Sequence, residues 1–456
     1  MRIPKSTLII VGLAVVGFLF RLWIVHLVPQ PFVYDQDEYY GYALGILNKG
    51  LHADLYRVYG YPLIVAPLIY LFGVKSSVPW TVFHGILDTA TALLVYWIAR
   101  HLSSPTRSGI QSLSKLDSRR SLPRTLMRGG NDSHLPAAWI AFILYLFNPF
   151  TAGYVGVLLS EVVTVFFVTL ISALLIRYFE KKSMPLFFVL ILLLGFLPQV
   201  RPVFIALSLV AAGVLIWAAE KRVKKIQEKL SFGFLTLVVF SLPFWYTIAG
   251  NLVYYRQFSV LGVEPTFVRE LYASLFIGRG MPFTDTKWGD WPVEAQNAWG
   301  AFTSPKDAAG RKAVADQHFQ LAMQIIRRDP AAFIQSRIAK MGYVWEKHFI
   351  YPYAMGKPTP EMKALTYWGN IAVLVLAVLG LCSAWKKNKH LVLAVGVLFL
   401  YIALAHVIST SEERFSLPAY PWVAIFAGYG IWTLVESLGF FHQGKAGGET
   451  SPSLLS

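Results

Sequence analysis

The chain has 456 residues, of which 55% are hydrophobic and only 14% are charged. Soluble domains usually carry about 25% charged residues, so the composition excludes an ordinary soluble protein. The formal net charge is +16, but the basic residues lie in short segments between long apolar runs, as in membrane proteins with basic cytoplasmic loops. The sequence therefore predicts a membrane protein and no nucleic-acid partner.

Ten apolar segments are long enough to cross a bilayer, which takes about 20 mostly apolar residues. The first covers about residues 8–28 and has no small-residue cleavage site behind it, so it reads as an uncleaved anchor. The others cover about residues 80–99, 137–153, 157–179, 186–200, 203–219, 232–250, 365–384, 391–408 and 417–435. We predict an all-α polytopic membrane protein with about ten transmembrane helices.

The basic residues predict the orientation of these helices. With the N-terminus in the cytoplasm, alternation places the basic clusters on the cytoplasmic side. These segments are residues 100–135, 180–184, 220–231, 385–390 and the tail after residue 436. Two long connections, residues 29–79 and 251–363, then lie outside, and we expect the active site of this cell-membrane protein in these extracytoplasmic regions.

The helices and connections divide the chain into four parts. Residues 1–250 form an N-terminal transmembrane module that includes the outer loop 29–79. Residues 251–363 form an extracytoplasmic loop and helical region, residues 364–437 the last transmembrane helices, and residues 438–456 a Gly- and Ser-rich tail that we expect to be disordered.

The sequence predicts helices within both of the long outer connections. Residues 61–73 contain two prolines and are too short to span, so we expect a helix along the outer interface. A second helical stretch is expected from about residue 305 to 344. Cys382 is the single cysteine, so the chain forms no intrachain disulfide.

Acidic residues gather in YDQDEYYGYALGILNKG, residues 34–50, just after the first apolar segment. Asp35, Asp37 and Glu38 lie near the membrane surface, where partial desolvation can raise the basicity of a carboxylate toward that of a general base. Asp35 can cap the helix that follows, with Tyr39 one turn further along. The alternative is a solvated acidic helix start.

The spacing of Asp35, Tyr39, Ala43 and Gly50, followed by GYPLIVAPLIYLFG, resembles the GT-C superfamily of glycosyltransferases. Within it, the pattern resembles the branch of protein O-mannosyltransferases and lipid A aminoarabinose transferases. The likeness recurs in LLSEVVTVFF around Glu161, in SLPFWYTIAGNLVYYRQF and in EERFSLPAYP. It implies a GT-C-like bundle that transfers a sugar from a polyprenyl-phosphate donor to a lipid, glycan or protein acceptor on the extracytoplasmic face.

The resemblance implies that Asp35 is the general base. Two departures leave Asp37 as an alternative catalytic residue: Gln36 stands where many relatives have Glu, and Val58 and Tyr59 stand where they have two prolines. We favour Asp35 because only from it do the other residues of the pattern lie at the family's offsets.

A second acidic residue, Glu161, begins the fourth apolar segment at its outer end. The resemblance implies a place near the acceptor or a sugar hydroxyl, and we assign Glu38 and Tyr39 to acceptor or sugar binding as well. For Glu161 the alternative is an acid stabilised by the dipole at a helix N-terminus.

Three arginines are candidates for donor-phosphate binding. Arg201 and Arg414 are isolated cations on the side that the positive-inside rule leaves poor in basic residues, and Arg57 is a weaker candidate in the first outer loop. Guanidinium groups bind phosphate bidentately. The alternative is contact with lipid headgroups or with Glu412 and Glu413.

Charged residues inside the apolar segments should face the protein interior, because they are costly in hydrocarbon. We expect Arg21 to contact Asp88, with lipid-phosphate binding as the alternative. His84 and Asp88 are four residues apart, which lets them meet on one helix face.

The sequence shows no P-loop, no dinucleotide fingerprint and no His or Cys pair at metal-ligand spacing. We therefore expect no nucleotide-sugar donor, no cofactor and no metal. A divalent cation at Asp35, Asp37 and Glu38 is an alternative that we do not favour. The competing function is a transporter or flippase of lipid-linked sugars, but the chain lacks the related halves with broken helices that are common in transporters.

Overall fold

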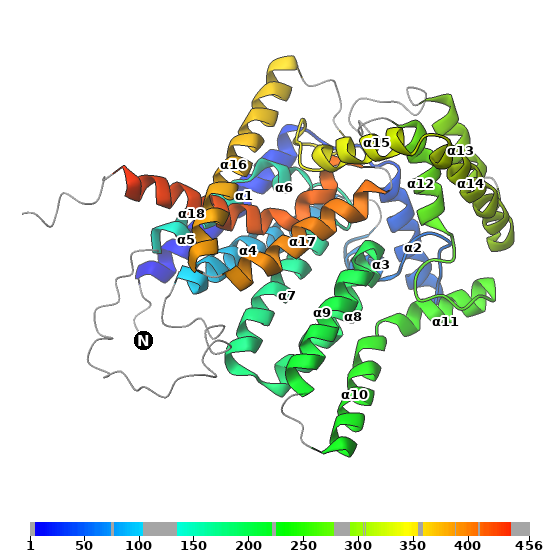
Figure 1. Ribbon diagram of the computed structural model, residues 1–456, viewed down its shortest axis with the longest axis horizontal. Coiled ribbons are helices and arrows are strands. Elements are labelled where there is room, and N and C mark those ends of the chain that lie inside the picture. The colour runs from blue at the N-terminus through cyan, green and yellow to red at the C-terminus, as the bar shows by residue number, and fades with distance from the viewer. Residues whose placement is uncertain are drawn as a thin grey trace, which may run out of the picture.

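The computed structural model describes residues 5–73, 77–103, 135–220, 225–277, 292–303, 305, 307–353, 359–387, 389–408 and 411–438. Throughout these ranges the regular secondary structure is helical (Figure 1), which confirms the all-α prediction. Most of the expected basic loop 100–135 and of the expected disordered tail lies outside the described residues.

Among the described residues, six helices are long and apolar enough to cross a membrane, or seven if one bent pair is counted as one span. They are α1 (Lys5–Leu27), α4 (Val78–Ser103), α5 with α6 (Leu135–Leu146 and Pro149–Gly153), α7 (Glu161–Lys181), α9 (Ile205–Glu220) and α16 (Pro360–Lys387). The helices α3 (Gly60–Phe72), α8 (Met184–Val200), α17 (Lys389–Val407) and α18 (Tyr420–Ser437) fall below that threshold. A multi-pass membrane protein is thus supported, and the expected number of ten spans is not confirmed.

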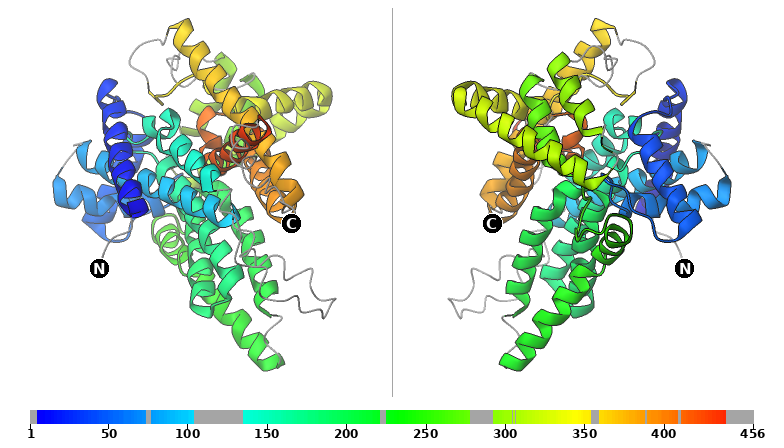
Figure 2. Two further views of the ribbon diagram at one scale, coloured as in Figure 1. Left: turned by 90° about the vertical axis from the view of Figure 1, so that its left-hand side faces the viewer. Right: turned by 90° about the vertical axis from the view of Figure 1, so that its right-hand side faces the viewer.

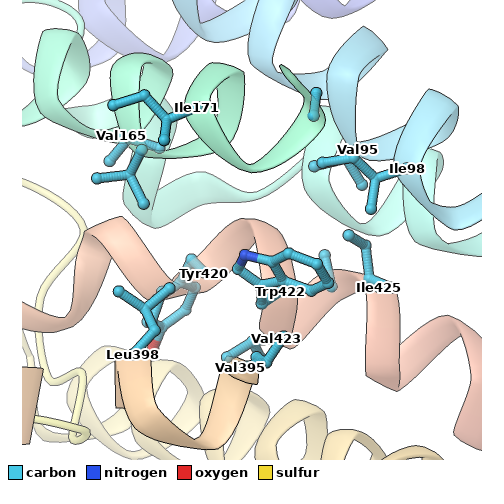
Figure 3. Close-up of a cluster of buried hydrophobic side chains, with 14 of the residues drawn as sticks. Val95, Ile98, Val165, Ile171, Val395, Leu398, Tyr420, Trp422, Val423 and Ile425 are labelled. Atoms are coloured by element: carbon cyan, nitrogen blue, oxygen red, sulfur yellow. The ribbon is translucent and has the colours of Figure 1, made fainter. Parts of the chain in front are cut away.

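The last helix, α18, lies at the centre of the bundle. Residues 420–430 are all buried, and the helix packs against α5 and α16. Figure 3 shows Trp422 and Ile425 of α18 between Val95 of α4 and Val165 of α7 on one side and Val395 of α17 on the other. The first three turns of α18 carry no charged residue, and a helix face of this kind is expected to be buried.

Small residues allow α16 and α18 to approach closely. A Cβ atom on Gly380 would overlap the carbonyl of Phe426, and one on Gly430 would overlap the carbonyl of Leu376. Close backbone approach at small residues is a main source of helix association in membranes. This contact therefore fixes how α18 sits in the bundle.

The span expected over residues 232–250 is not one straight helix. The chain forms α10 (Ile226–Ser241) and α11 (Phe244–Tyr255), which are bent by 59° at the break between them. Pro243 lies at the break, where its ring removes an N–H donor and clashes with the preceding turn. α10 packs along α8, and one end of it projects beyond the other helices (Figures 1 and 2).

The two long connections that were expected to lie outside are helical. The first contains α2 (Asp35–Lys49) and α3, which confirms the helix expected over residues 61–73, and the second contains α12 (Thr266–Phe276), α13 (Val293–Thr303), α14 (Ala308–Arg328) and α15 (Pro330–Tyr343). The expected helix over residues 305–344 is divided because Asp329 caps α15 and Pro330 occupies its first turn. Two short 3₁₀ helices, η3 (Pro202–Phe204) and η5 (Glu413–Ala419), precede α9 and α18.

The orientation of the bundle can be tested by cysteine labelling in a Cys382→Ser background. Asp316 on α14 and Glu228 at the start of α10 are exposed and lie on opposite sides in the expected topology. Asp316→Cys should react with an impermeant thiol reagent in intact cells, and Glu228→Cys should react only after permeabilisation. The reverse pattern would place α2 and η5 in the cytoplasm.

Candidate functional site

The helix α2 begins at Asp35. The sequence suggested Asp35 as the N-cap of this helix, but the structure does not place it there. Tyr34 occupies the cap position with φ of 54° and no side-chain cap hydrogen bond. Residues other than glycine rarely adopt this conformation. The carboxylate of Asp35 instead forms ion pairs with two guanidinium groups. Arg57 Nη2 lies 2.7 Å from Asp35 Oδ1, and Arg414 Nη2 lies 3.2 Å from Asp35 Oδ2.

The ion pairs continue beyond Asp35. Glu161 Oε1 lies 3.5 Å from Arg414 Nη1 and 3.2 Å from Arg201 Nη1. The order Arg57, Asp35, Arg414, Glu161, Arg201 is a series of alternating charges, which we call the ion-pair chain. All five residues were candidates from the sequence, and the structure brings them into contact.

Local packing positions each member of the ion-pair chain. Asp54 Oδ1 accepts hydrogen bonds from the backbone N–H groups of Tyr56 and Arg57 and so orders the turn before α3. A Cβ atom on Gly60 would overlap the carbonyl of Gln199, so α3 packs tightly on the end of α8, directly before Arg201. Glu161 is the first residue of α7, and Arg414 lies in η5.

The electrostatics of Asp35 are dominated by its neighbours. Burial raises the pKa of Asp35, but Arg57 and Arg414 together lower it more, so that it falls to about 2. The carboxylate is therefore charged at neutral pH and is a weak base while both guanidinium groups stay in place. Removing either contact would raise its pKa.

Glu412 is a second carboxyl group at the same guanidinium. Arg414 Nη2 donates to Glu412 Oε1 at 3.2 Å and to Asp35 Oδ2 at 3.2 Å, so one nitrogen serves both carboxyl groups. Burial raises the pKa of Glu412 to about 7, although Arg414 opposes this. Two neighbouring carboxyl groups with widely separated pKa values are typical of acid and base sites. From the sequence, Glu412 was only an alternative contact for Arg414.

The remaining acidic candidates differ in position. Glu38 Oε2 accepts a hydrogen bond from Arg57 Nε at 2.8 Å. Tyr39 is buried, its ring lies 4.6 Å from the Arg57 guanidinium carbon, and its hydroxyl donates to Ser160 Oγ. Asp37 is exposed on the same turn and lies outside the ion-pair chain.

Two residues that the sequence gave no reason to select, Lys347 and His348, hold η5 in place. Lys347 Nζ donates to the Glu413 carbonyl at 2.5 Å and to Ser416 Oγ at 2.9 Å. Burial lowers the pKa of Lys347 to about 7, although Glu413 opposes this. The Glu413 carboxylate accepts from the His348 backbone N–H at 2.8 Å. These contacts fix the segment that carries Arg414.

The charged residues inside the bundle form a separate cluster. Arg21 Nε donates to Asp88 Oδ2 at 2.7 Å, as expected, and Tyr145 and Thr151 also donate to Asp88. His84 does not pair with Asp88 as its spacing allowed. Its ring nitrogens lie near the Tyr61 hydroxyl and the carbonyl of residue 155.

The ion-pair chain has the chemistry of an anion-binding site. Three guanidinium groups converge there, and a phosphate could replace a carboxylate on any of them by exchanging one anionic partner for another. Among the described residues, no three His, Cys, Asp or Glu side chains are placed to hold a metal ion.

Comparisons with known proteins give both a family and several structural matches. The model of the family described as GPI transamidase subunit PIG-U matches residues 51–280, which is half of the chain. Structures of the oligosaccharyltransferase of Archaeoglobus fulgidus also match: tethered to an acceptor peptide (12% identity, TM-score 0.44), with an inhibitory peptide and a dolichol-phosphate (12%, 0.41), and in the apo form (13%, 0.40).

The matches cover different shares of this chain and of the matched proteins. The three structures cover 95%, 96% and 95% of this chain, but only 50%, 51% and 51% of their own chains, so this chain spans about half their length. No curated protein is a significant match to the sequence. The family match includes Arg57, Glu161 and Arg201 of the ion-pair chain, and on the extent of that match the chain belongs to the PIG-U family.

Proposed function

We propose that the protein is a membrane glycosyltransferase that takes a sugar from a polyprenyl-phosphate carrier on the extracytoplasmic face. The ion-pair chain is the observation that carries this proposal, because it gathers three guanidinium groups and two carboxylates from five separate segments. Buried ion pairs add little net stability. A cluster of this size at the outer ends of the helices therefore favours a binding role.

Donor binding would use the guanidinium groups. The phosphate of the donor would accept hydrogen bonds from Arg201 and Arg414, with Arg57 beside them, while the polyprenyl tail stays in the bilayer. The phosphate would take the place of Asp35 and Glu161 as the partner of these groups. No guanidinium is left unpaired at any point of this exchange.

The same exchange would activate Asp35. Once the phosphate shares Arg57 and Arg414, the interactions that hold the pKa of Asp35 at about 2 weaken and its basicity rises. Asp35 then accepts the proton of the acceptor hydroxyl as the hydroxyl oxygen bonds to the anomeric carbon and the bond from that carbon to the phosphate oxygen breaks. The phosphate leaves as an anion that the arginines stabilise.

The acceptor side of the site would be formed by Glu38, Tyr39 and Glu161. The acceptor is a hydroxyl group on a lipid, a glycan or a protein. The mechanism uses no cofactor and no metal. The donor is a polyprenyl monophosphate because the spacing of Asp35, Tyr39, Ala43 and Gly50 resembles that of the O-mannosyltransferases and aminoarabinose transferases.

The family match favours a second candidate function. The family is named for a subunit of GPI transamidase, so the ion-pair chain could hold a phosphate-bearing lipid within a larger assembly without transferring sugar. Purified protein that transfers labelled sugar without any partner would support the first function. Purified protein that binds the lipid phosphate but never transfers sugar would support the second.

Replacing Arg201 or Arg414 with Ala should weaken donor binding by tenfold or more. Each change removes a charge-assisted contact to a buried anion, a loss typically of about 2 to 5 kcal/mol. Calorimetric titration of the detergent-purified protein with a polyprenyl-phosphate sugar measures this. Arg177→Ala, at the far end of α7 and exposed, is the matched control. If both variants bind like the parent, the phosphate lies elsewhere.

Asp35→Asn should abolish most transfer while the protein still binds donor. Asn keeps the size of the side chain but cannot accept the proton, and loss of a positioned base typically costs about a hundredfold to ten-thousandfold in rate. Asp37→Asn, on the exposed side of the same turn, is the control and should be milder. Near-parent transfer by Asp35→Asn together with inactive Asp37→Asn would place the base two residues later. Activity in both would remove the main support for glycosyl transfer.

Donor binding should weaken as the pH rises through about 7. Glu412 has its pKa raised to about 7, so above this pH it becomes a third anion on Arg414, beside Asp35 and Glu161, and competes with the phosphate. Glu412→Gln keeps the protonated form at every pH and should bind with little pH dependence. The sugar-loaded donor is the probe because its phosphodiester stays ionised across this range. The same slope in parent and variant would contradict this role of Glu412.

A further inference from the structure

Tyr353 lies in the segment between α15 and α16, at the border of the site. Its side chain is only 6% exposed. The ring packs near Tyr34, with centroids 6.1 Å apart, and its backbone N–H donates to Gln30 Oε1 at 2.8 Å. These contacts hold the ring beside the residue that directly precedes Asp35.

The hydroxyl of Tyr353 is unusual within this region. It is buried and has no hydrogen-bond partner among the described residues. Buried polar groups are nearly always hydrogen-bonded, because an unmade bond costs stability. By contrast, the nearby hydroxyl of Tyr351 donates to the Ile24 carbonyl at 3.0 Å, and that of Tyr39 donates to Ser160.

The charged groups of the site act on this hydroxyl. Burial raises the pKa of Tyr353 well above its ordinary value, and the carboxyl groups of Asp35, Glu161 and Glu412 raise it further, while Arg414 lowers it. The phenol therefore stays protonated and can donate a hydrogen bond. The charges of Asp35, Glu161 and Arg414 act on it electrostatically, but it forms a hydrogen bond to none of them.

We propose that Tyr353 is a substrate-binding residue whose hydroxyl donates a hydrogen bond to an oxygen of the bound substrate beside Asp35. The substrate would supply the partner that the hydroxyl lacks among the described residues. That oxygen belongs either to the sugar phosphate of the donor or to the acceptor. The inference rests on the proposed function and assigns to the outer region 251–363 a direct contact with substrate.

Tyr353→Phe tests this inference because it removes only the hydroxyl. Transfer of labelled sugar from a polyprenyl-phosphate carrier should fall by about tenfold or more, as expected for one lost hydrogen bond to a charged or strongly polar group. The melting temperature should stay the same or rise, since no hydrogen bond within the protein is lost. Tyr351→Phe is the matched control: it should lower the melting temperature and leave transfer near that of the parent.

A binding experiment separates the two sources of the oxygen. The probes are undecaprenyl phosphate and dolichyl phosphate, titrated into the purified parent and into Tyr353→Phe. Weaker binding by the variant assigns the oxygen to the donor. Unchanged binding with a higher KM for the acceptor or a lower kcat assigns it to the acceptor.

Two results would overturn the inference. Parent-like binding and transfer by Tyr353→Phe would show that the hydroxyl touches no substrate. A melting temperature that falls together with activity would show that the hydroxyl bonds within the protein. A parent protein that neither binds the lipid phosphates nor transfers sugar would instead refute the proposed function itself, and the inference with it.

Discussion

The carboxylate of Asp35 is held between two guanidinium groups that come from distant parts of the sequence. Arg57 is 22 residues away and Arg414 is 379 residues away. In a poorly solvated site, a charge that loses its partner costs far more than the pair contributes to stability. The first outer loop, the ends of α7 and α8, and η5 must therefore stay together. The packing of the other helices keeps these four segments in contact.

The stability of the protein comes mainly from elsewhere. The α18 helix is enclosed by its neighbours and approaches α16 closely at Gly380 and Gly430. Because η5 leads directly into α18, Arg414 lies only a few residues from the most buried helix of the bundle. The packing of α18 thus fixes one end of the ion-pair chain, and Lys347 fixes the same segment through its hydrogen bonds to Glu413 and Ser416.

Much of the architecture could be predicted because it depends on local properties of the sequence. Apolar runs identified the helices, and the scarcity of outer cations singled out Arg201 and Arg414. Other features depend on tertiary contacts. Asp is a favoured cap, yet two guanidinium groups outside its own helix draw Asp35 away from that role. A proline within an apolar run did not reveal that the helix bends there by 59°.

The residues that the sequence did not suggest share a physical reason. Glu412 lies two residues before Arg414 in the sequence, so a simple ion pair explained it, and its raised pKa arises from burial. Tyr353 is one of 23 tyrosines, and only the surrounding structure shows that its hydroxyl is buried without a hydrogen-bond partner among the described residues. Burial and the presence or absence of a partner are properties of the folded chain. The spacing of residues in the sequence therefore cannot predict burial or the lack of a hydrogen-bond partner.

We propose Asp35 rather than Glu161 as the proton acceptor because the two carboxylates, which both lie between two arginines, differ in exposure. A phosphate that binds the guanidinium groups would release either carboxylate. The side chain of Asp35 is 25% exposed, whereas that of Glu161 is 4% exposed. A base must reach the hydroxyl of an incoming acceptor, so the more accessible carboxylate is the one that can exchange a proton. Glu161 is enclosed at the start of α7, where its carboxylate contacts Arg201 and Arg414.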